Sequence, residues 1–548
     1  MKNAADIIIY GGTSSGVIAA IQASRMSHSV ILIEPSRRLG GLTTGGLGST
    51  DMGNNKSVGG LAQEFYRRIN EYYGDRSNWT CQTPEEYEVA MRNYYNCPWH
   101  DETIAWRFEP SAAVKVFQAM LQESGARVIC GERLDRVSGV KMREGSISSI
   151  TMKSGRSFDG GMFIDTTYEG DLMAAAGIPY HVGREANSTY QETCNGIQYE
   201  RFKQFHQLKE GIDPYRIKGK PESGLLPGID PAEFGTEGEG DQRIQSYCFR
   251  MCLTDKPENR LPFSKPDNYD EMDFELLFRN IEIGGTETPL PGLSDWGMSN
   301  ILPFNSGLLP NRKTDSNNKS GFSTDFIGQN HRYPEADDEE RTQIIQRHLD
   351  YQQGLMWTLA NHPRVPEAVR QEMNLWGTCK DEFIEDRGWQ EQLYIREARR
   401  MVSDYVMTEH NCLGHTVVND SIGLGSYDLD SHHVRRFINK NGWVQNEGDV
   451  QVFEVSPYPI PYRSIVPRKS DCCNLLVPVC IAASHIAYGS VRMEPTFMIL
   501  GQSAATAACH ALDEQVPVQE INSTQLKNRL SADGQIVSWD ESLVEADK

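Results

Sequence analysis

The fold is decided by the stretch DIIIYGGTSSGVIAAIQASRMSHSVILIE, residues 6–34. Residues 6–10 form an apolar run rich in isoleucine, which predicts a buried strand, and a glycine-rich turn at 11–16 follows directly. The small residues at 17–24 predict a helix, and residues 29–33 predict a second strand. A strand, glycine turn, helix and strand in this order predict a compact βαβ unit of the kind that binds dinucleotides.

The glycine turn offers a site for a phosphate group. A helix that starts directly after such a turn presents free backbone N–H groups and the positive end of its dipole. Gly11 and Gly16 fill the first and third positions of the GxGxxG pattern, whereas Thr13 occupies the second, where the backbone usually approaches the phosphate closely. On this turn alone, an ordinary strand-to-helix connection stays open as the alternative.

Glu34 strengthens the prediction of a dinucleotide site. It follows the second strand, 23 residues after Gly11, close to the spacing of about 20 residues at which a carboxylate accepts hydrogen bonds from the adenosine ribose. A carboxylate there repels a 2′-phosphate, so NADP is disfavoured. The local turn also explains how an acidic chain holds an anionic cofactor.

From residue 35 onward the sequence resembles the flavoproteins with two dinucleotide-binding domains, in which FAD fills the first unit. Over nearly the whole chain it is similar to the bacterial family called FAD-dependent oxidoreductase, with a glutathione-reductase-like FAD domain. The motifs that carry this resemblance are PSRRLGGLTTGGLG at 35–48, FEPS at 108–111, DTTYEGDL at 165–172, LPNRKTD at 309–315, QLYIREARR at 392–400, DSIGLGSY at 420–427, and the segment 474–508.

The resemblance implies that FAD is the cofactor and assigns its contacts by position. The glycine turn would hold the pyrophosphate, Glu34 the ribose, and residues 42–46 would run beside the isoalloxazine ring. Thr13 and Pro478-Val479 depart from the family pattern at the phosphate and ribityl contacts. The cofactor-binding residues predicted in this way are Gly11, Gly12, Thr13, Ser15, Gly16, Glu34, Pro35, Arg38, Gly40, Gly41, Leu42, Thr43, Thr44, Val128, Thr166 and Gly501.

Changes in amino-acid composition along the chain predict three segments. Residues 1–176 form the first part of the FAD-binding domain, residues 177–455 an inserted substrate domain, and residues 456–548 the return to the first domain. The insert is rich in Gly, Pro and Asn loops, with helices expected at 337–360 and 390–409. The expected fold class is α/β, a discontinuous Rossmann-like FAD-binding domain with an inserted α+β substrate domain.

Candidate catalytic residues cluster in the last third of the chain. Pro495 opens a predicted helix at 496–512, whose N-terminus would face the N1–C2 carbonyl edge of a reduced flavin. His485 is the leading acid/base candidate, with a satisfied structural histidine as the alternative. Arg492, Tyr458 and Arg463 are further candidates, and the proline-spaced tyrosines also fit a rigid crossing between domains.

Three other side-chain groups are less informative. Adjacent His432 and His433 are further candidates for the chemistry, but they lack the rest of a metal-ligand set, so no metal site is predicted. Within 392–400, the arginines suit a charged helix face or an ion-pair network better than an anion clamp. The twelve cysteines include no CxxC pair and are too sparse for a disulfide scaffold.

Composition excludes several classes of protein. The 548 residues include 54 Lys and Arg against 75 Asp and Glu, a formal net charge of −21, which disfavours nucleic acid as a partner. The uncharged stretch 472–491 contains asparagine, proline, serine and histidine, so we expect buried core and no membrane span. The expected location is the cytoplasm, or the periplasm or exterior if a leader has been removed.

Three functional hypotheses follow. The first is an FAD-dependent oxidoreductase that transfers a hydride from a small polar, carbohydrate-like substrate to flavin N5. The second keeps the flavin and reduces or desaturates a carboxylate-bearing substrate held by Arg463 or Arg492. The third is a non-catalytic protein that binds a dinucleotide or a glycan. No motif identifies the electron acceptor.

Overall fold

The two ends of the chain build one mixed sheet. The computed structural model describes residues 3–95, 103–203, 206–284 and 304–540. The strands run in the order β3-β2-β1-β6-β5-β4, and β20 pairs with β6. These strands are β1 (Ala4–Tyr10), β2 (Val30–Glu34), β3 (Arg127–Cys130), β4 (Val140–Arg143), β5 (Ser146–Thr151), β6 (Ser157–Asp165) and β20 (Leu475–Leu476). Because β20 returns to the sheet that β1 opens, the predicted discontinuous α/β fold is confirmed.

The parallel part of this sheet brings the predicted cofactor residues to one edge. β1 pairs in parallel with β2 and with β6, and Ile7, Ile8 and Ile9 are completely buried between the layers on its two faces. A strand covered on both faces needs such an unbroken apolar run. The carboxyl ends of β1, β2 and β6 therefore meet at one edge, where open α/β sheets bind their ligands.

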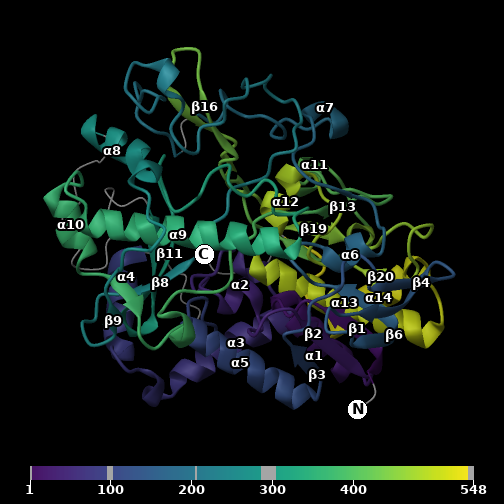
Figure 1. The fold of residues 1–548 in the computed structure, drawn as a ribbon. Coiled ribbons are helices and arrows are strands. Elements are labelled where there is room, and N and C mark those ends of the chain that lie inside the picture. Colours follow the sequence, from purple (N-terminus) through teal and green to yellow (C-terminus); the bar gives the residue numbers. More distant parts are fainter. Residues whose placement is uncertain (1–2, 96–102, 204–205, 285–303, 541–548) are drawn as a thin grey trace.

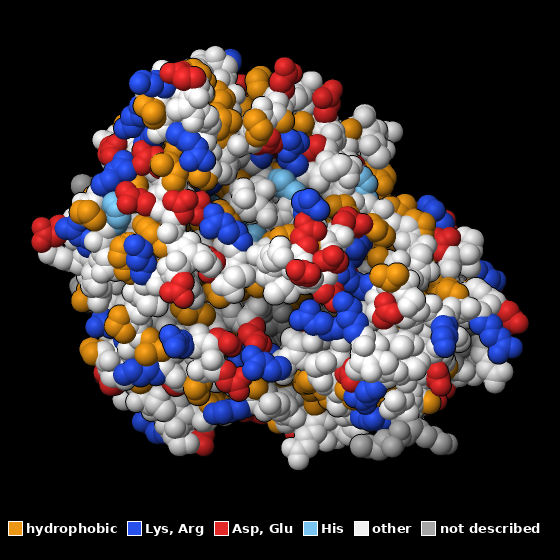
Figure 2. Space-filling model, in the orientation of Figure 1, with side chains coloured by type: hydrophobic (Ala, Val, Ile, Leu, Met, Phe, Trp, Pro, Cys, Tyr) orange, Lys and Arg blue, Asp and Glu red, His pale blue; other side chains and the backbone are white. Residues whose placement is uncertain are grey.

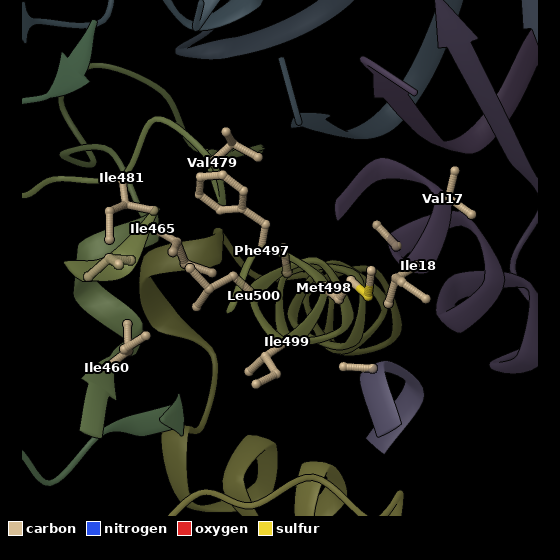
Figure 3. Close-up of a cluster of buried hydrophobic side chains, with 14 of the residues drawn as sticks. Val17, Ile18, Ile460, Ile465, Val479, Ile481, Phe497, Met498, Ile499 and Leu500 are labelled. Atoms are coloured by element: carbon tan, nitrogen blue, oxygen red, sulfur yellow. The ribbon is translucent and has the colours of Figure 1, made fainter. Parts of the chain in front are cut away.

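Two helices from opposite ends of the sequence pack together beside the sheet. They are α1 (Ser14–Arg25) and α13 (Glu494–Glu514). Figure 3 shows Met498 of α13 on the side of Val17 and Ile18 of α1, with Leu500 directed toward Ile465. Gly501 permits this approach, because a Cβ atom there would lie 2.3 Å from the carbonyl oxygen of Ser15.

The remaining helices around the sheet enclose the same core. Phe65 and Phe117 stack with ring centroids 4.3 Å apart and join α3 to α5. The helices of this region are α2 (Gly41–Thr44), α3 (Gly60–Gly74), α5 (Pro110–Ser124), α6 (Asp171–Ala175), α12 (His485–Val491) and α14 (Ser523–Ala532), whereas α4 (Pro84–Tyr95) lies at the second sheet, where the Tyr87 hydroxyl donates to the Leu308 carbonyl at 3.4 Å.

The middle of the chain builds a second sheet with its own core. Its antiparallel strand order is β10-β11-β8-β12-β9. In Figure 1, α9 runs across the molecule between this region and the first sheet. Tyr351 of α9 stacks on Phe326 with ring centroids 4.0 Å apart. The elements are β8 (Met251–Thr254), β9 (Arg260–Leu261), β10 (Phe304–Leu309), β11 (Lys313–Asn318), β12 (Gly377–Cys379), α8 (Glu275–Glu282), α9 (Asp338–Asn361) and α10 (Glu367–Met373).

Short antiparallel pairs connect the two regions. They are β7 with β13, β14 with β19, β15 with β18, and β16 with β17. Their bounds, with two short helices, are β7 (Tyr180–His181), α7 (Asn187–Tyr190), β13 (Arg400–Met401), α11 (Glu409–Cys412), β14 (Ser421–Gly425), β15 (Leu429–Ser431), β16 (Arg435–Ile438), β17 (Val444–Glu447), β18 (Val450–Val452) and β19 (Tyr458–Pro461). These small sheets fit the α+β character expected of the insert.

One predicted helix is confirmed and another is wrong. The helix expected at 337–360 is α9, whereas residues 392–399 contain no helix and lead into strand β13. The error arises because the charged pattern there is buried: Arg396 pairs with Asp325 and Arg400 with Glu185. An extended backbone lets neighbouring side chains reach partners on opposite sides. The ion-pair network is therefore the correct interpretation of these arginines.

Many charged side chains lie at the surface (Figure 2), whereas the longest uncharged stretch of the sequence is buried. Figure 2 shows acidic and basic side chains interspersed over one face of the molecule. The uncharged stretch 472–491 includes β20 and α12 and is almost wholly buried in the core. Within the described ranges, no helix combines the length and apolar character needed to cross a membrane.

Candidate functional site

The glycine turn joins β1 to α1 and is held by Thr13. Thr13 occupies the N-cap of α1, where its Oγ1 accepts a hydrogen bond from the Gly16 N–H at 3.4 Å. The same hydroxyl donates to the Thr166 carbonyl at 2.7 Å. A Cβ atom on Gly16 would lie 2.0 Å from the Gly11 carbonyl oxygen, so only glycine fits there. The departure from glycine at position 13 thus supplies a helix cap and a link to the end of β6.

Glu34 closes the end of β2 over this turn. Its Oε2 accepts from the Gly12 N–H and its Oε1 from the Ser36 N–H, both at 2.6 Å. Burial raises the pKa of Glu34 above its ordinary value, against the lowering effect of these hydrogen bonds. The carboxylate therefore sits at the edge of the sheet where the sequence predicts the ribose contact.

A cavity of about 490 Å³ opens between these elements and α9. Its lining residues include Gly11, Thr13, Glu34, Pro35, Gly131, Tyr168, Arg341, Gln392, Leu393 and Ile395. The Ser15 hydroxyl at the first turn of α1 is buried and has no hydrogen-bonding partner in the described part of the chain. A capped helix N-terminus and a carboxylate beside one cavity fit the phosphate and ribose groups of FAD.

Charged residues tie α9 to the cofactor-side sheet across this cavity. Asp171 accepts from Arg341 at 2.7 and 2.9 Å and from Arg399 at 3.0 Å. Arg136 lies 3.5 Å from Asp171 and 2.6 Å from Asp338 of α9. Burial by itself raises the pKa of Asp171, but the arginines outweigh it and hold the pKa below its ordinary value. The cavity is thus roofed by a segment held in place by ion pairs.

The N-terminus of α13 meets the loop that the sequence predicts beside the flavin. Thr43 Oγ1 donates to Glu494 at 2.6 Å, and the Tyr168 hydroxyl donates to the same carboxylate at 2.7 Å. The Leu42 N–H donates to the Tyr168 hydroxyl at 2.9 Å. Leu42 and Thr43 are therefore fixed against the first residue of α13, as a ring binding there requires.

Of the predicted cofactor residues, Gly11, Thr13, Glu34 and Pro35 line the cavity, and the others lie outside its lining. Gly40 donates its N–H to the Gly12 carbonyl at 2.6 Å, and Gly41 and Thr44 follow in α2. Arg38 lies 4.8 Å over the ring of Phe383 and donates to the Thr44 carbonyl. Val128 lies within β3 opposite Leu32, and Gly501 faces α1, so neither lines the cavity.

A second polar cluster lies beside α13. Arg492 donates Nη1 to the Tyr394 hydroxyl at 2.8 Å and Nη2 to Asp430 at 3.1 Å. Arg250 contacts Asp315 at 2.6 Å and Asp51 at 2.9 Å. The guanidinium groups of Arg250, Arg396 and Arg492 lie 4.6–5.8 Å from the Tyr394 ring. We call these residues, with Asp325 and His432, the Tyr394 cluster.

The segment around Tyr394 connects the two sites. Leu393 and Ile395 line the cofactor cavity, whereas Tyr394 between them contacts the arginines of the cluster. Two glycine contacts place the flavin-side loop against the same region: a Cβ on Gly45 would meet Gln392, and one on Gly46 would meet the Arg250 carbonyl. A substrate bound in the Tyr394 cluster would therefore lie next to the ring-binding loop.

Of the four predicted catalytic residues, only Arg492 belongs to the Tyr394 cluster. His485 is 1% exposed, and its Nδ1 lies 2.8 Å from Glu397 and its Nε2 3.0 Å from Ser431 Oγ. Tyr458 is buried with its hydroxyl 2.6 Å from Ser490 Oγ. Arg463 has a side chain 55% exposed and pairs with Asp420 at the surface. This geometry supports the structural alternative for His485.

None of the four carboxylates of the cluster, Asp51, Asp315, Asp325 and Asp430, was predicted as a site residue. Asp325 Oδ2 lies 2.8 Å from His432 Nδ1 although the two residues are 107 positions apart. Asp51 lies in the loop that follows the Gly-Gly motif. No spacing rule links either residue to the histidines, because the contact depends on how the insert folds back. The only sequence signal was the adjacent pair His432-His433.

Comparison with known proteins places the chain in a sequence family. The family model described as FAD dependent oxidoreductase matches residues 6–530. No curated protein matches. Among solved structures, L-amino acid deaminase from Proteus vulgaris matches 34% of this chain and 53% of its own at 12% identity, with a TM-score of 0.22. L-proline dehydrogenase from P. horikoshii matches 34% of this chain and 60% of its own at 17% identity, with a TM-score of 0.23.

A third solved structure is NikD, titled an unusual amino acid oxidase essential for nikkomycin biosynthesis. It matches 33% of this chain and 57% of its own at 13% identity, with a TM-score of 0.21. The chain thus covers little more than half the length of these structures. Similarity this low carries no argument about substrate or mechanism.

Proposed function

The chain belongs to the FAD dependent oxidoreductase family, and on that premise we propose that it oxidises a hydroxyl group of a small polar, carbohydrate-like molecule. The substrate would bind at the Tyr394 cluster, between an FAD-binding domain made of residues 1–176 and 456–548 and an inserted substrate domain of residues 177–455. The partly exposed carboxylates of the cluster are the observation that carries this proposal.

FAD supplies the redox chemistry when bound, because its oxidised ring accepts a hydride at N5. The chain's own residues hold it. The N-terminus of α1, capped by Thr13, takes the pyrophosphate, and Glu34 accepts from the ribose. Tyr168 holds Leu42 and Glu494 holds Thr43 at the place where the ring would lie. Val128 and Gly501 would influence FAD binding only indirectly, through the packing of β3 and α13.

The substrate class follows from the polar groups that remain accessible in the cluster. The side chains of Asp51 and Asp430 are 28% and 22% exposed. Each already accepts from a buried arginine and keeps further lone pairs for other donors. Burial alone would raise the pKa of Asp430, but His432 and Arg492 lower it to about 2. Paired carboxylates of this kind suit several hydroxyl donors at once.

A carboxylate-bearing substrate fits this geometry less well. Arg463 is exposed and paired with Asp420, so it does not lie in an enclosed substrate site. Arg492 donates Nη1 to Tyr394 and Nη2 to Asp430, and only its Nε is without a partner in the described residues, so a carboxylate bound by two hydrogen bonds would displace one of these contacts. Family membership also replaces the non-catalytic hypothesis with an enzyme.

Anaerobic mixing with a substrate panel tests the proposed function. The panel contains aldoses, polyols, 2-hydroxy acids and amino acids, and the visible absorbance of protein-bound flavin is followed. We expect aldoses or polyols to bleach the flavin. Bleaching by amino acids alone, or by no member of the panel, would show that the proposed substrate class is wrong.

A further inference from the structure

We propose that His432, oriented by Asp325, accepts the substrate's hydroxyl proton. This inference rests on the proposed function and names the residue that performs its proton step. His432 follows β15 in the insert, and its side chain is 11% exposed, so it is accessible from the cluster while being held by its neighbours.

The two ring nitrogens of His432 are in different situations. Nδ1 lies 2.8 Å from Asp325 Oδ2, a hydrogen-bonding distance. Nε2 lies 3.6 Å from Asp430 Oδ2, which is beyond a direct hydrogen bond. A carboxylate on Nδ1 fixes the tautomer that carries its proton there, which leaves the Nε2 lone pair for a substrate hydroxyl.

The contacts around Asp325 favour the ionised form of its carboxylate. Its side chain is 2% exposed, and Oδ1 lies 2.8 Å from Arg396 Nη1. Burial by itself raises the pKa of Asp325, but Arg396 and His432 outweigh it and hold the pKa well below its ordinary value. An ionised Asp325 can orient the neutral imidazole and then stabilise the imidazolium, the arrangement that a histidine base requires.

A chain of contacts places His432 near the start of α13. Asp430, 3.6 Å from Nε2, accepts from Arg492 Nη2 at 3.1 Å. Arg492 lies two residues before Glu494, whose carboxylate accepts a hydrogen bond from the Thr43 hydroxyl in the loop expected beside the flavin ring. A substrate carbon between this loop and Nε2 would have its hydroxyl directed to His432 and its hydrogen to the cofactor side.

The neighbouring histidines are engaged elsewhere. Both ring nitrogens of His485 lie within hydrogen-bonding distance of Glu397 and Ser431 inside the core. His433 is 3% exposed, and its Nε2 contacts the His206 carbonyl at 2.8 Å. Of these three, His432 alone combines partial exposure with a carboxylate within hydrogen-bonding distance of one ring nitrogen only.

The step balances without a further reactant. The substrate O–H bond breaks and its proton goes to Nε2, while the C–H bond breaks and its hydrogen leaves with both electrons to oxidised FAD. The carbon becomes a carbonyl carbon. The charged groups that face the resulting imidazolium are Asp325 and Asp430, with Arg396 and Arg492 behind them.

The test uses the full-length FAD-loaded protein and the panel member that bleaches the parental protein fastest. His432→Gln should lower the anaerobic bleaching rate constant by about 10²–10⁴-fold, the usual contribution of a general base. Its flavin content should stay unchanged. His415→Gln, at an exposed histidine, is the matched control and should retain the parental rate constant.

Two further measurements separate a proton acceptor from a structural residue. In His432→Gly, added imidazole should restore part of the lost rate, whereas it should leave Asp325→Asn unchanged. The fall of kcat/KM toward low pH should be present in the parental protein and absent from His432→Gln. His485→Gln should keep its pH profile even if its folding is weakened.

The possible results distinguish a failure of the proposed function from a failure of the role assigned to His432. If the parental protein is bleached by no hydroxylated member, the proposed function fails, and this inference fails with it. If the parental protein is bleached and His432→Gln is bleached equally fast, His432 is not the base and the proposed function stands. Loss of the pH-dependent limb in His485→Gln alone would move the role to His485.

Discussion

Asp171→Asn removes the charge on which three arginines converge at the roof of the cofactor cavity. Arg341 contributes hydrogen bonds of 2.7 and 2.9 Å, Arg399 one of 3.0 Å, and Arg136 lies at 3.5 Å. The side chain of Asp171 is 11% exposed. Removing one partner of a buried ion pair costs about 3–5 kcal/mol, because the remaining charges stay buried without compensation. We therefore expect the free energy of unfolding to fall by about that amount.

The assay is urea unfolding of the FAD-loaded protein, followed by circular dichroism. Asp420→Asn is the matched control, because it breaks the pair with Arg463, whose side chain is 55% exposed. An exposed pair contributes only about 0.2–1 kcal/mol. Flavin fluorescence in dilute solution should also show faster FAD release from Asp171→Asn. A loss of stability no larger than that of Asp420→Asn would refute the argument that the buried network holds α9 over the cofactor.

Gly16→Ala should yield protein with little or no bound flavin, measured by absorbance after reconstitution, because its Cβ would lie 2.0 Å from the Gly11 carbonyl oxygen; full loading would contradict the proposed turn. Gly501→Ala should lower stability by about 1–3 kcal/mol, because its Cβ would lie 2.3 Å from the Ser15 carbonyl oxygen; an unchanged urea midpoint would contradict the packing. Burial alone would raise the pKa of Glu185, but a buried arginine lowers it from 4.5 to about 2. The lowered pKa of Glu185 contributes about 3 kcal/mol to the free energy of unfolding, a contribution that should be complete above pH 4.5 and lost toward pH 2. Urea titrations at several pH values should show a smaller loss of stability at low pH in Glu185→Gln than in the parental protein.

The first βαβ unit could be predicted because its signals are local. The isoleucine run of β1, the glycine turn and Glu34 each follow from neighbouring residues, and the structure has all of them in one sheet edge. The return of the chain to the first domain was predicted from the apolar residues near position 475, and the pairing of β20 with β6 was found only in the structure. These elements depend on patterns with a period of a few residues, which a single sequence displays.

The extended segment before β13 could not be predicted because its determinants are distant. Arg396 and Arg400 look like an exposed helix face in the sequence, but their partners Asp325 and Glu185 lie 71 and 215 positions away. Burial of a guanidinium group depends on such partners being present in the fold. Composition alone cannot show which charges are paired.

The candidate site divides in the same way. The glycine turn and Glu34 are fixed by local spacing, so the geometry of this turn was predictable. The contact between His432 and Asp325 spans 107 positions and forms only when the insert folds back on itself. His485 stood out because it lies in an apolar stretch, yet that burial engages both of its nitrogens.

An anaerobic titration with product analysis tests the central claim, that hydroxyl oxidation is coupled to FAD held at this cavity. The purified, FAD-loaded protein is mixed in limiting amounts with the aldose or polyol that bleaches it, and carbonyl product is counted against reduced flavin. The account predicts one new carbonyl group for each FAD reduced. Protein that cannot be loaded with FAD, or flavin that is reduced without formation of a carbonyl product, would contradict it.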